Sequence, residues 1–122
     1  MNETRPLPEE TAVAEKRRLV ADEGDRHLPE LAKALLDLSR ACEQADRIEE
    51  ALATAHESVA TLSPDFLAKP QRFAVPMRAL LAQYVALARR SPARPDTALL
   101  APIAQALGDL TLAEDEAEDS NW

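Results

Sequence analysis

The sequence predicts an all-α protein of about five helices folded around one core. Aromatic residues make up only 3% of the 122 residues and there are just 2 glycines, while Ala and Leu are abundant, which favours helices over strands. Apolar residues recur at spacings of three and four along most of the chain, so they share one face of a helix. A chain of this length can bury one core, and 46% hydrophobic residues are enough to fill it.

The first two helices are predicted on either side of Gly24. Residues 1–8 contain two prolines and few apolar side chains, so we expect a flexible leader there and a first helix over 9–23. Glycine favours the end of a helix, and Asp is a preferred N-cap, so Asp25 is expected to start a second helix over 25–44. The apolar stripe of this second helix consists of Leu28, Leu31, Leu35, Leu38 and Cys42.

A third helix is predicted over residues 48–62, antiparallel to the second because the turn between them is short. Asp46 and Glu49 have the spacing of a capping box at its start. Prolines follow in the segment 63–75, which we expect to be a connector with at most a short helical turn. Its two phenylalanines are expected to point inward.

The C-terminal part is predicted to hold two more helices. The fourth covers residues 76–90, starts at a proline and has the widest apolar arc, so it should be the most buried. The fifth covers residues 96–107, where Pro102 either kinks the helix or marks a late start, and it ends at Gly108. Residues 109–122 contain six acidic residues and no basic one, and such a segment is expected to form a disordered tail. The single folded domain is therefore expected over residues 9–108.

Charge limits the classes of partner. The formal net charge is -8, from 14 Lys and Arg against 22 Asp and Glu, which disfavours nucleic acid and anionic membranes as partners. The single Cys42 cannot form an internal disulfide, and the first ten residues lack the pattern of a secretory signal. We expect a cytoplasmic protein with no transmembrane segment.

No pattern of enzyme chemistry is found in the sequence. His56-Glu57 is followed by Ala60 where a second zinc-binding histidine would be required. Cys42 lies on an apolar stripe without cationic neighbours, so a reactive thiolate is not expected there. We therefore expect no catalytic residue, no cofactor and no metal, and a non-enzymatic function.

The segment from Leu35 to Ser58 resembles a tetratricopeptide repeat. It has the form Leu35-x2-Leu38-Ser39-x2-Cys42-x8-Ala51-x3-Ala55-x2-Ser58, which keeps the spacing of that helix-turn-helix signature. A second unit is indicated by Leu81-x2-Tyr84-Val85-x2-Ala88, with the fifth helix as its partner. The resemblance implies antiparallel helix pairs stacked in a right-handed array.

The resemblance also implies a binding groove. In tetratricopeptide proteins the first helix of each pair lines a concave groove that binds a peptide segment of a partner protein. The corresponding positions here are Lys33, Leu36, Arg40 and Glu43 in the second helix and Ala79, Ala82, Ala86 and Arg89 in the fourth. Three of them, Lys33, Arg40 and Arg89, would pair with an acidic side chain or a C-terminal carboxylate.

Two other functions remain open at this point. A small acidic inhibitor, such as an immunity or nucleic-acid-mimic protein, would act through its negative surface. Separately, Trp122 at the end of the acidic tail is a candidate docking anchor. An assembly component would instead use the apolar fourth helix to form an oligomer, for example a homodimer. A protein with so few repeats leaves part of its apolar helix faces uncovered as a monomer. The adaptor needs the basic groove residues, whereas the inhibitor needs the acidic clusters.

Overall fold

The computed structural model describes residues 7–92 and 94–113, and these residues form five α-helices and no strand. This confirms the predicted all-α class. The elements are α1 (Pro8–Glu23), a 3₁₀ turn η1 (Asp25–His27), α2 (Leu28–Gln44), α3 (Ile48–Ala68), α4 (Pro70–Arg89) and α5 (Thr97–Ala113). None of the described helices is both long enough and apolar enough to cross a membrane.

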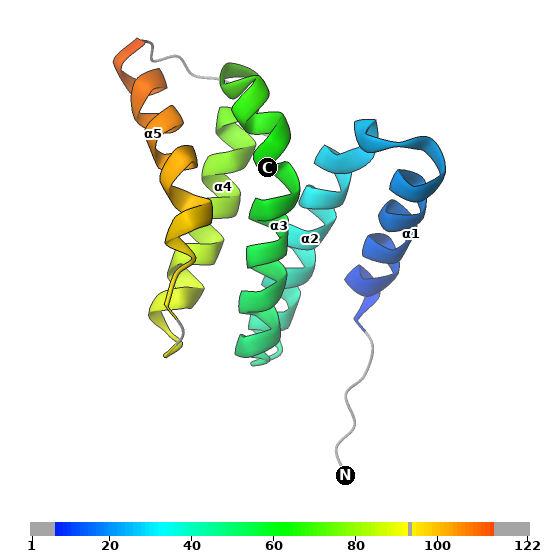
Figure 1. Cartoon of the computed structure of the whole chain (residues 1–122). Coiled ribbons are helices and arrows are strands. Elements are labelled where there is room, and N and C mark those ends of the chain that lie inside the picture. Colours follow the sequence, from blue (N-terminus) through cyan, green and yellow to red (C-terminus); the bar gives the residue numbers. More distant parts are fainter. Residues whose placement is uncertain (1–6, 93, 114–122) are drawn as a thin grey trace.

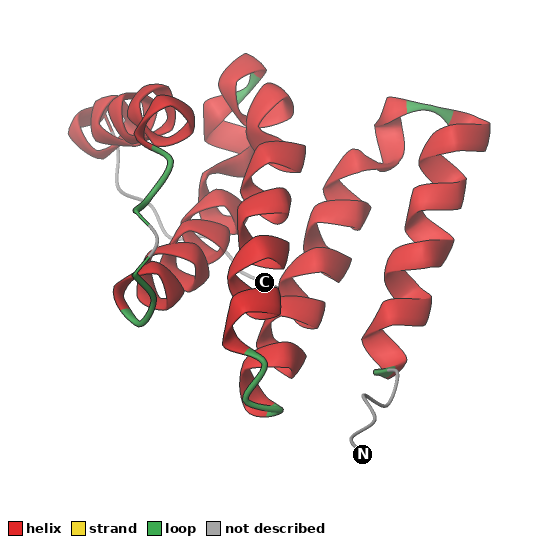
Figure 2. Cartoon of the chain, turned by 60° about the horizontal axis from the view of Figure 1, so that its bottom comes forward, coloured by secondary structure: helices red, strands yellow, loops and turns green. Residues whose placement is uncertain are grey.

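The helices stand side by side in chain order, each antiparallel to the one before it (Figure 1). Each helix packs on the next, and α2 also contacts α4 while α3 contacts α5. Figure 2 shows the pair α1 and α2 at one end of this row and α5 at the other. The helices α2 and α4 run in the same direction (Figure 1) and contact each other directly.

The core has one main part and one smaller part. The smaller part holds α1 against α2 and is built from Val13, Leu31, Ala34 and Leu35. Two ion pairs tie α1 to α3 and its N-cap: Arg17 binds Glu57 through two nitrogens at 2.6 and 3.0 Å, and Arg47 lies 3.5 Å from Glu10. The main part lies between α2, α3, α4 and α5 and includes Leu36, Cys42, Val59, Leu62, Phe66, Met77, Leu80, Tyr84, Leu87 and Ile103.

The roles predicted for Gly24 and Asp46 at helix ends are confirmed only in part. Gly24 ends α1 as predicted, with a φ of 102° that disfavours other residues. Asp46 does not cap α3, whose N-cap is Arg47 without a side-chain hydrogen bond. Instead Asp46 adopts a φ of 65° and ends α2: its N–H donates to the carbonyl of Glu43 at 3.0 Å, and the N–H of Arg47 donates to that of Cys42 at 2.8 Å. This pair of bonds is a Schellman motif.

The predicted connector over residues 63–75 is wrong, because nearly all of it is helical. The helix α3 continues through Pro64 to Ala68, and α4 begins at Pro70 and contains Pro76. A proline inside a helix removes one backbone hydrogen bond, but this segment buries Phe66 completely and also buries Pro76. Burial of these side chains offsets the lost hydrogen bonds.

The fifth helix is longer than expected. It begins at Thr97 after Asp96, contains Pro102 and continues beyond Gly108 to Ala113. The expectation of a disordered tail from residue 109 is therefore corrected for 109–113, where Leu110 is buried and extends the core contact of the helix. The rest of the expected tail, 114–122, and most of the expected leader, 1–6, lie outside the described residues.

Candidate functional site

The predicted groove residues on α2 have different environments. Lys33 is half-buried, and its Nζ binds both carboxylate oxygens of Asp37 at 3.0 and 3.1 Å. Arg40 is exposed, and no ion pair to it is found in the part of the chain that the structure describes. Leu36 is 0% exposed and belongs to the main core. The expectation that Leu36 lines the groove is therefore wrong: it lies on the side of α2 that is covered by its neighbours.

Glu43 connects α2 to α4. Its carboxylate accepts a hydrogen bond from Nε2 of Gln83 at 3.1 Å and another from Nη1 of Arg90 at 2.7 Å. Gln83 also donates to the hydroxyl of Ser39 at 3.1 Å, and that buried hydroxyl donates to the carbonyl of Ala51 at 2.8 Å. Glu43 thus joins two helices, and it is less available to a partner than the sequence suggested.

The outer face of α4 is exposed and carries small and basic side chains. Arg78, Ala82, Ala86 and Arg89 are all exposed, and their spacings of three and four place them on one face of the helix. Arg89 is adjacent in sequence to Arg90, and Arg40 lies three residues before Glu43, so each is close in sequence to a residue of the contact between α2 and α4. We call the set Lys33, Arg40, Arg78, Ala82, Ala86 and Arg89 the α2–α4 surface.

Basic residues are concentrated in and around α4. Residues 66–95 contain six basic residues and no acidic one, in a chain of net charge -8. Arg90 is paired with Glu43. The other five are exposed, and no ion pair to any of them is found within 7–92 and 94–113: Lys69, Arg72, Arg78, Arg89 and Arg94.

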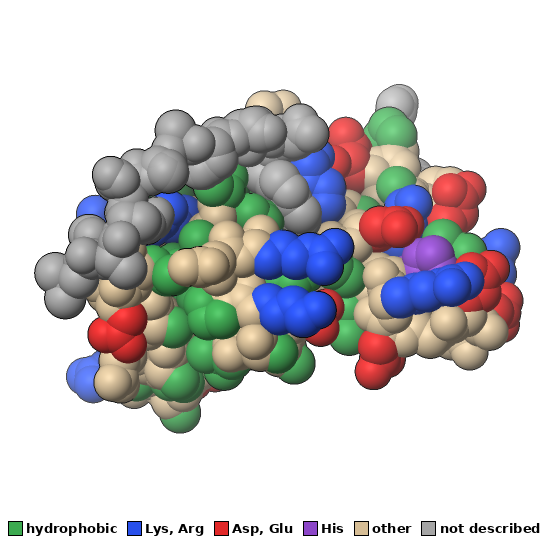
Figure 3. All heavy atoms as spheres, turned by 90° about the horizontal axis from the view of Figure 1, so that it is seen from above, with side chains coloured by type: hydrophobic (Ala, Val, Ile, Leu, Met, Phe, Trp, Pro, Cys, Tyr) green, Lys and Arg blue, Asp and Glu red, His purple; other side chains and the backbone are tan. Residues whose placement is uncertain are grey.

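The N-terminal helices have the opposite arrangement. Lys16, Arg17, Arg26 and Arg47 each pair with a nearby glutamate. Figure 3 shows this mixture at the right of the view, where acidic and basic side chains alternate around a histidine, whereas basic side chains stand side by side near the middle. Neighbouring carboxylates already neutralise most of the positive charge on α1 and η1, but not the charge on α4.

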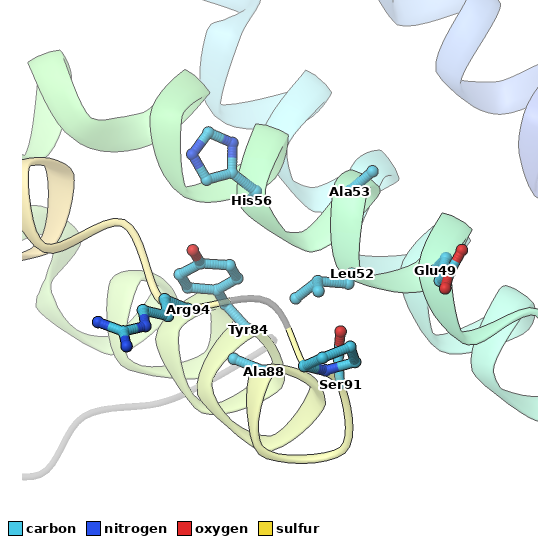
Figure 4. Close-up of a pocket in the computed structure, with 9 residues that line it drawn as sticks. Glu49, Leu52, Ala53, His56, Tyr84, Ala88, Ser91 and Arg94 are labelled. Carbon is cyan, nitrogen blue, oxygen red and sulfur yellow. The ribbon is translucent and has the colours of Figure 1, made fainter.

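An open pocket of 680 Å³ lies between α3, α4 and the segment that follows α4. Apolar side chains line its middle, and Glu49, His56 and Arg94 bring charged or polar groups to its edges (Figure 4). In Figure 4, His56 lies above Tyr84 and Leu52, and Ser91 lies below them.

A hydrogen-bond network beside this pocket determines where α5 begins. Nε2 of His56 lies 2.9 Å from Oδ2 of Asp96, and the rings of His56 and Tyr84 meet edge to face at 5.6 Å. Oδ1 of Asp96 accepts from the N–H of Leu99 at 3.1 Å, and the N–H of Asp96 donates to the Tyr84 hydroxyl at 2.9 Å. The hydrogen bonds from His56 and then Leu99 lower the pKa of Asp96, so its carboxylate stays ionised.

Cys42 and the acidic residues form no recognisable reactive centre in the described ranges. Cys42 is 3% exposed, and burial raises the pKa of its thiol, which favours the unreactive protonated form. No group of three or more His, Cys, Asp or Glu side chains that could hold a metal ion occurs among the described residues.

The sequence predicted Arg40 and Arg89 as groove residues, and both are exposed, but the prediction omitted Arg78, which is exposed on the same face of α4 as Arg89. The signal was available, because the absence of acidic residues between Asp65 and Asp96 can be seen in the sequence alone. The pairing of His56 with Asp96 had no local signal, since 40 residues separate the two.

No family model, no curated protein and no solved structure matches this chain.

Proposed function

We propose that this protein is a non-enzymatic interaction module that binds an acidic segment of a partner protein on the α2–α4 surface. The observation that carries the proposal is the set of exposed basic residues of α4 and its flanks that have no carboxylate partner among the described residues. In a chain with 22 acidic residues, such positive charge attracts a negatively charged segment from outside the fold.

The shape of the α2–α4 surface supports a peptide as the ligand. Ala82 and Ala86 leave a smooth strip along α4 between Arg78 and Arg89, so a backbone can approach closely while its acidic side chains reach the flanking guanidinium groups. Guanidinium groups bind carboxylates with two parallel hydrogen bonds, which orients the ligand. The strip of small alanine side chains and the arginines that flank it together favour an extended or helical acidic segment as the ligand.

The order of helix contacts supports an adaptor of the tetratricopeptide type. If the chain is arranged like tetratricopeptide repeats, its second and fourth helices are the inner helices of two successive pairs, and inner helices of successive pairs contact each other. The contact of α2 with α4 through Glu43, Gln83 and Arg90 is consistent with that arrangement. The proposed ligand surface then lies on the inner helices, where that family binds its peptides.

Selection from a displayed library of random twelve-residue peptides tests the proposal. We expect the full chain to select peptides rich in Asp and Glu, and the Arg78→Glu/Arg89→Glu variant to lose them. The control Arg18→Glu/Arg26→Glu makes the same change in net charge on α1 and η1 and should bind normally. Selection of basic peptides that both variants still bind would contradict the proposal and favour the acidic inhibitor. Selection of no peptide would also contradict it.

A further inference from the structure

A second basic site lies at the corner where α3 meets α4. Lys69, Pro70, Gln71 and Arg72 line a hollow of 490 Å³ there, and Leu110 of α5 completes it. Lys69 and Arg72 are exposed, and no carboxylate within residues 7–92 and 94–113 pairs with either. The guanidinium of Arg72 lies over the ring of Phe73, at 5.3 Å from its centroid, which holds the charge near the corner.

The acidic end of the chain is attached beside this corner. Leu110 lines the hollow, and α5 is described only three residues further, to Ala113. Residues 114–122 follow, with five acidic residues, no basic one and a terminal tryptophan. Nine residues span at most about 30 Å when extended, which is about the length of a helix of 20 residues such as α4. The segment can therefore reach Lys69 and Arg72 without any change in the helices.

We propose that residues 114–122 bind the corner formed by Lys69, Pro70, Gln71, Arg72 and Leu110. The carboxylates of the segment pair with Lys69 and Arg72, and the apolar parts of Pro70 and Leu110 provide a surface for its non-polar atoms. The charges are complementary, and the tether keeps the segment close. Because the segment belongs to the same chain, its effective concentration at the corner is in the millimolar range. Even a contact with a millimolar dissociation constant would then be formed about half of the time.

This contact has a regulatory consequence that rests on the proposed function. The bound segment brings negative charge to the N-terminal end of α4, so it competes electrostatically with an acidic partner on the α2–α4 surface. Half occupancy of the corner would weaken partner binding by at most about twofold, the limit in which the bound segment excludes the partner completely. The C-terminal segment is thus an internal competitor built into the same chain.

Nuclear magnetic resonance of the full-length protein tests the contact itself. Three ¹⁵N-labelled proteins are compared with the wild type at low salt. The first neutralises the segment by Glu114→Gln, Asp115→Asn, Glu116→Gln, Glu118→Gln and Asp119→Asn; the second is Lys69→Glu/Arg72→Glu; the third is the control Arg18→Glu/Arg26→Glu. We expect neutralisation to shift the amide signals of Gln71 and Arg72 and to leave those of α1 unchanged.

The indole N–H signal of Trp122 gives the reciprocal measurement, because it is the only tryptophan. It should shift in Lys69→Glu/Arg72→Glu but not in the control, and about 1 M salt should produce the same shift in the wild type by screening the ion pairs. Unchanged signals at both the corner and Trp122 would overturn the proposal. Shifts that depend on protein concentration would also overturn it, since they would mean that the segment binds a second copy.

Failure of this contact and failure of the proposed function give different results. If the wild type and the neutralised protein give the same spectrum at the corner but both bind acidic peptides, only the contact is wrong. If the spectra differ but no acidic peptide is bound by either protein, the contact is supported and the proposed function is wrong.

Discussion

His56 on α3 donates a hydrogen bond from Nε2 to Oδ2 of Asp96, 2.9 Å away and 40 residues further along the chain. The same carboxylate caps α5 through Leu99, and the backbone N–H of Asp96 donates to the hydroxyl of Tyr84 on α4. Side chains of two helices therefore fix the starting point of a third. This explains how α5 packs on α3 and α4 although the segment before it contains two prolines.

Tyr84→Phe tests this network at the hydroxyl. The substitution keeps the buried ring and removes the acceptor of the Asp96 N–H, so we expect the free energy of unfolding to fall by about 1 kcal/mol. Urea denaturation followed by circular dichroism measures the change. An unchanged midpoint would show that the hydroxyl contributes nothing to the position of α5.

Stability should decrease in acid because of Asp96. The hydrogen bond from His56, and then that from Leu99, lower the pKa of Asp96 below its ordinary value of 3.8. A lowered pKa in the folded state stabilises the protein above the ordinary value, and this contribution is lost as the pH falls through the lower, folded-state pKa. Asp96→Asn should therefore be less stable than the wild type near neutral pH, and the difference should shrink as the pH falls below the ordinary pKa of 3.8.

Urea denaturation at a series of pH values checks this expectation. Asn retains an oxygen that can cap the helix, so the comparison isolates the charge of the carboxylate. A difference between the two proteins that stays constant from about pH 6 to about pH 2.5 would contradict the assigned role of the charge.

Leu36 and Leu67 form a matched pair for testing the core. Leu36 is 0% exposed and Leu67 is 41% exposed. We expect Leu36→Ala to lower the free energy of unfolding by about 2–5 kcal/mol because it leaves a cavity, and Leu67→Ala to change it by less than about 0.5 kcal/mol. Equal effects in thermal or urea unfolding would mean that Leu36 lies on a surface, as the tetratricopeptide pattern implied.

Asp46→Gly should stabilise the protein. Asp46 holds a left-handed φ of 65° after the end of α2, where glycine avoids the steric cost of a side chain. We expect a gain of about 0.5–1 kcal/mol in the free energy of unfolding. Gly24→Ala is the opposite control, since its φ of 102° should make alanine destabilising although no atom crowds the added methyl group. A loss of stability in Asp46→Gly would contradict the Schellman assignment.

Local patterns in the sequence predicted the parts of the fold that depend on local physics. The stop at Gly24 and the burial of Leu31, Leu35 and Cys42 are confirmed, whereas Leu28 and Leu38 of the same predicted stripe are only half-buried. The confirmed features follow from helical spacing or from the conformational freedom of glycine. The expected breaks at Pro64 and before Pro76 are wrong. Their lost hydrogen bonds are offset by packing against helices that lie elsewhere in the sequence, and a local pattern does not contain that packing.

For the candidate site too, the sequence predicted which side chains are exposed but not which ones pair across helices. Arg40 and Arg89 were found from helical position, and both are exposed. Glu43 was assigned to the groove, but it pairs with Gln83 and Arg90, which lie at least 40 residues away. Such pairs depend on how the helices are stacked, so they become visible only when the structure is known.

The proposed binding of an acidic segment to the α2–α4 surface can be measured directly. Its most direct test is a fluorescence anisotropy titration with one labelled peptide of alternating glutamate and leucine, using the wild type, Arg78→Glu/Arg89→Glu and the charge-matched Arg18→Glu/Arg26→Glu. We expect at least about tenfold weaker binding for the first variant, because reversing the charges places like charges together, and an unchanged Kd for the second. Equal losses in both variants would show that only net charge matters and would contradict the claim.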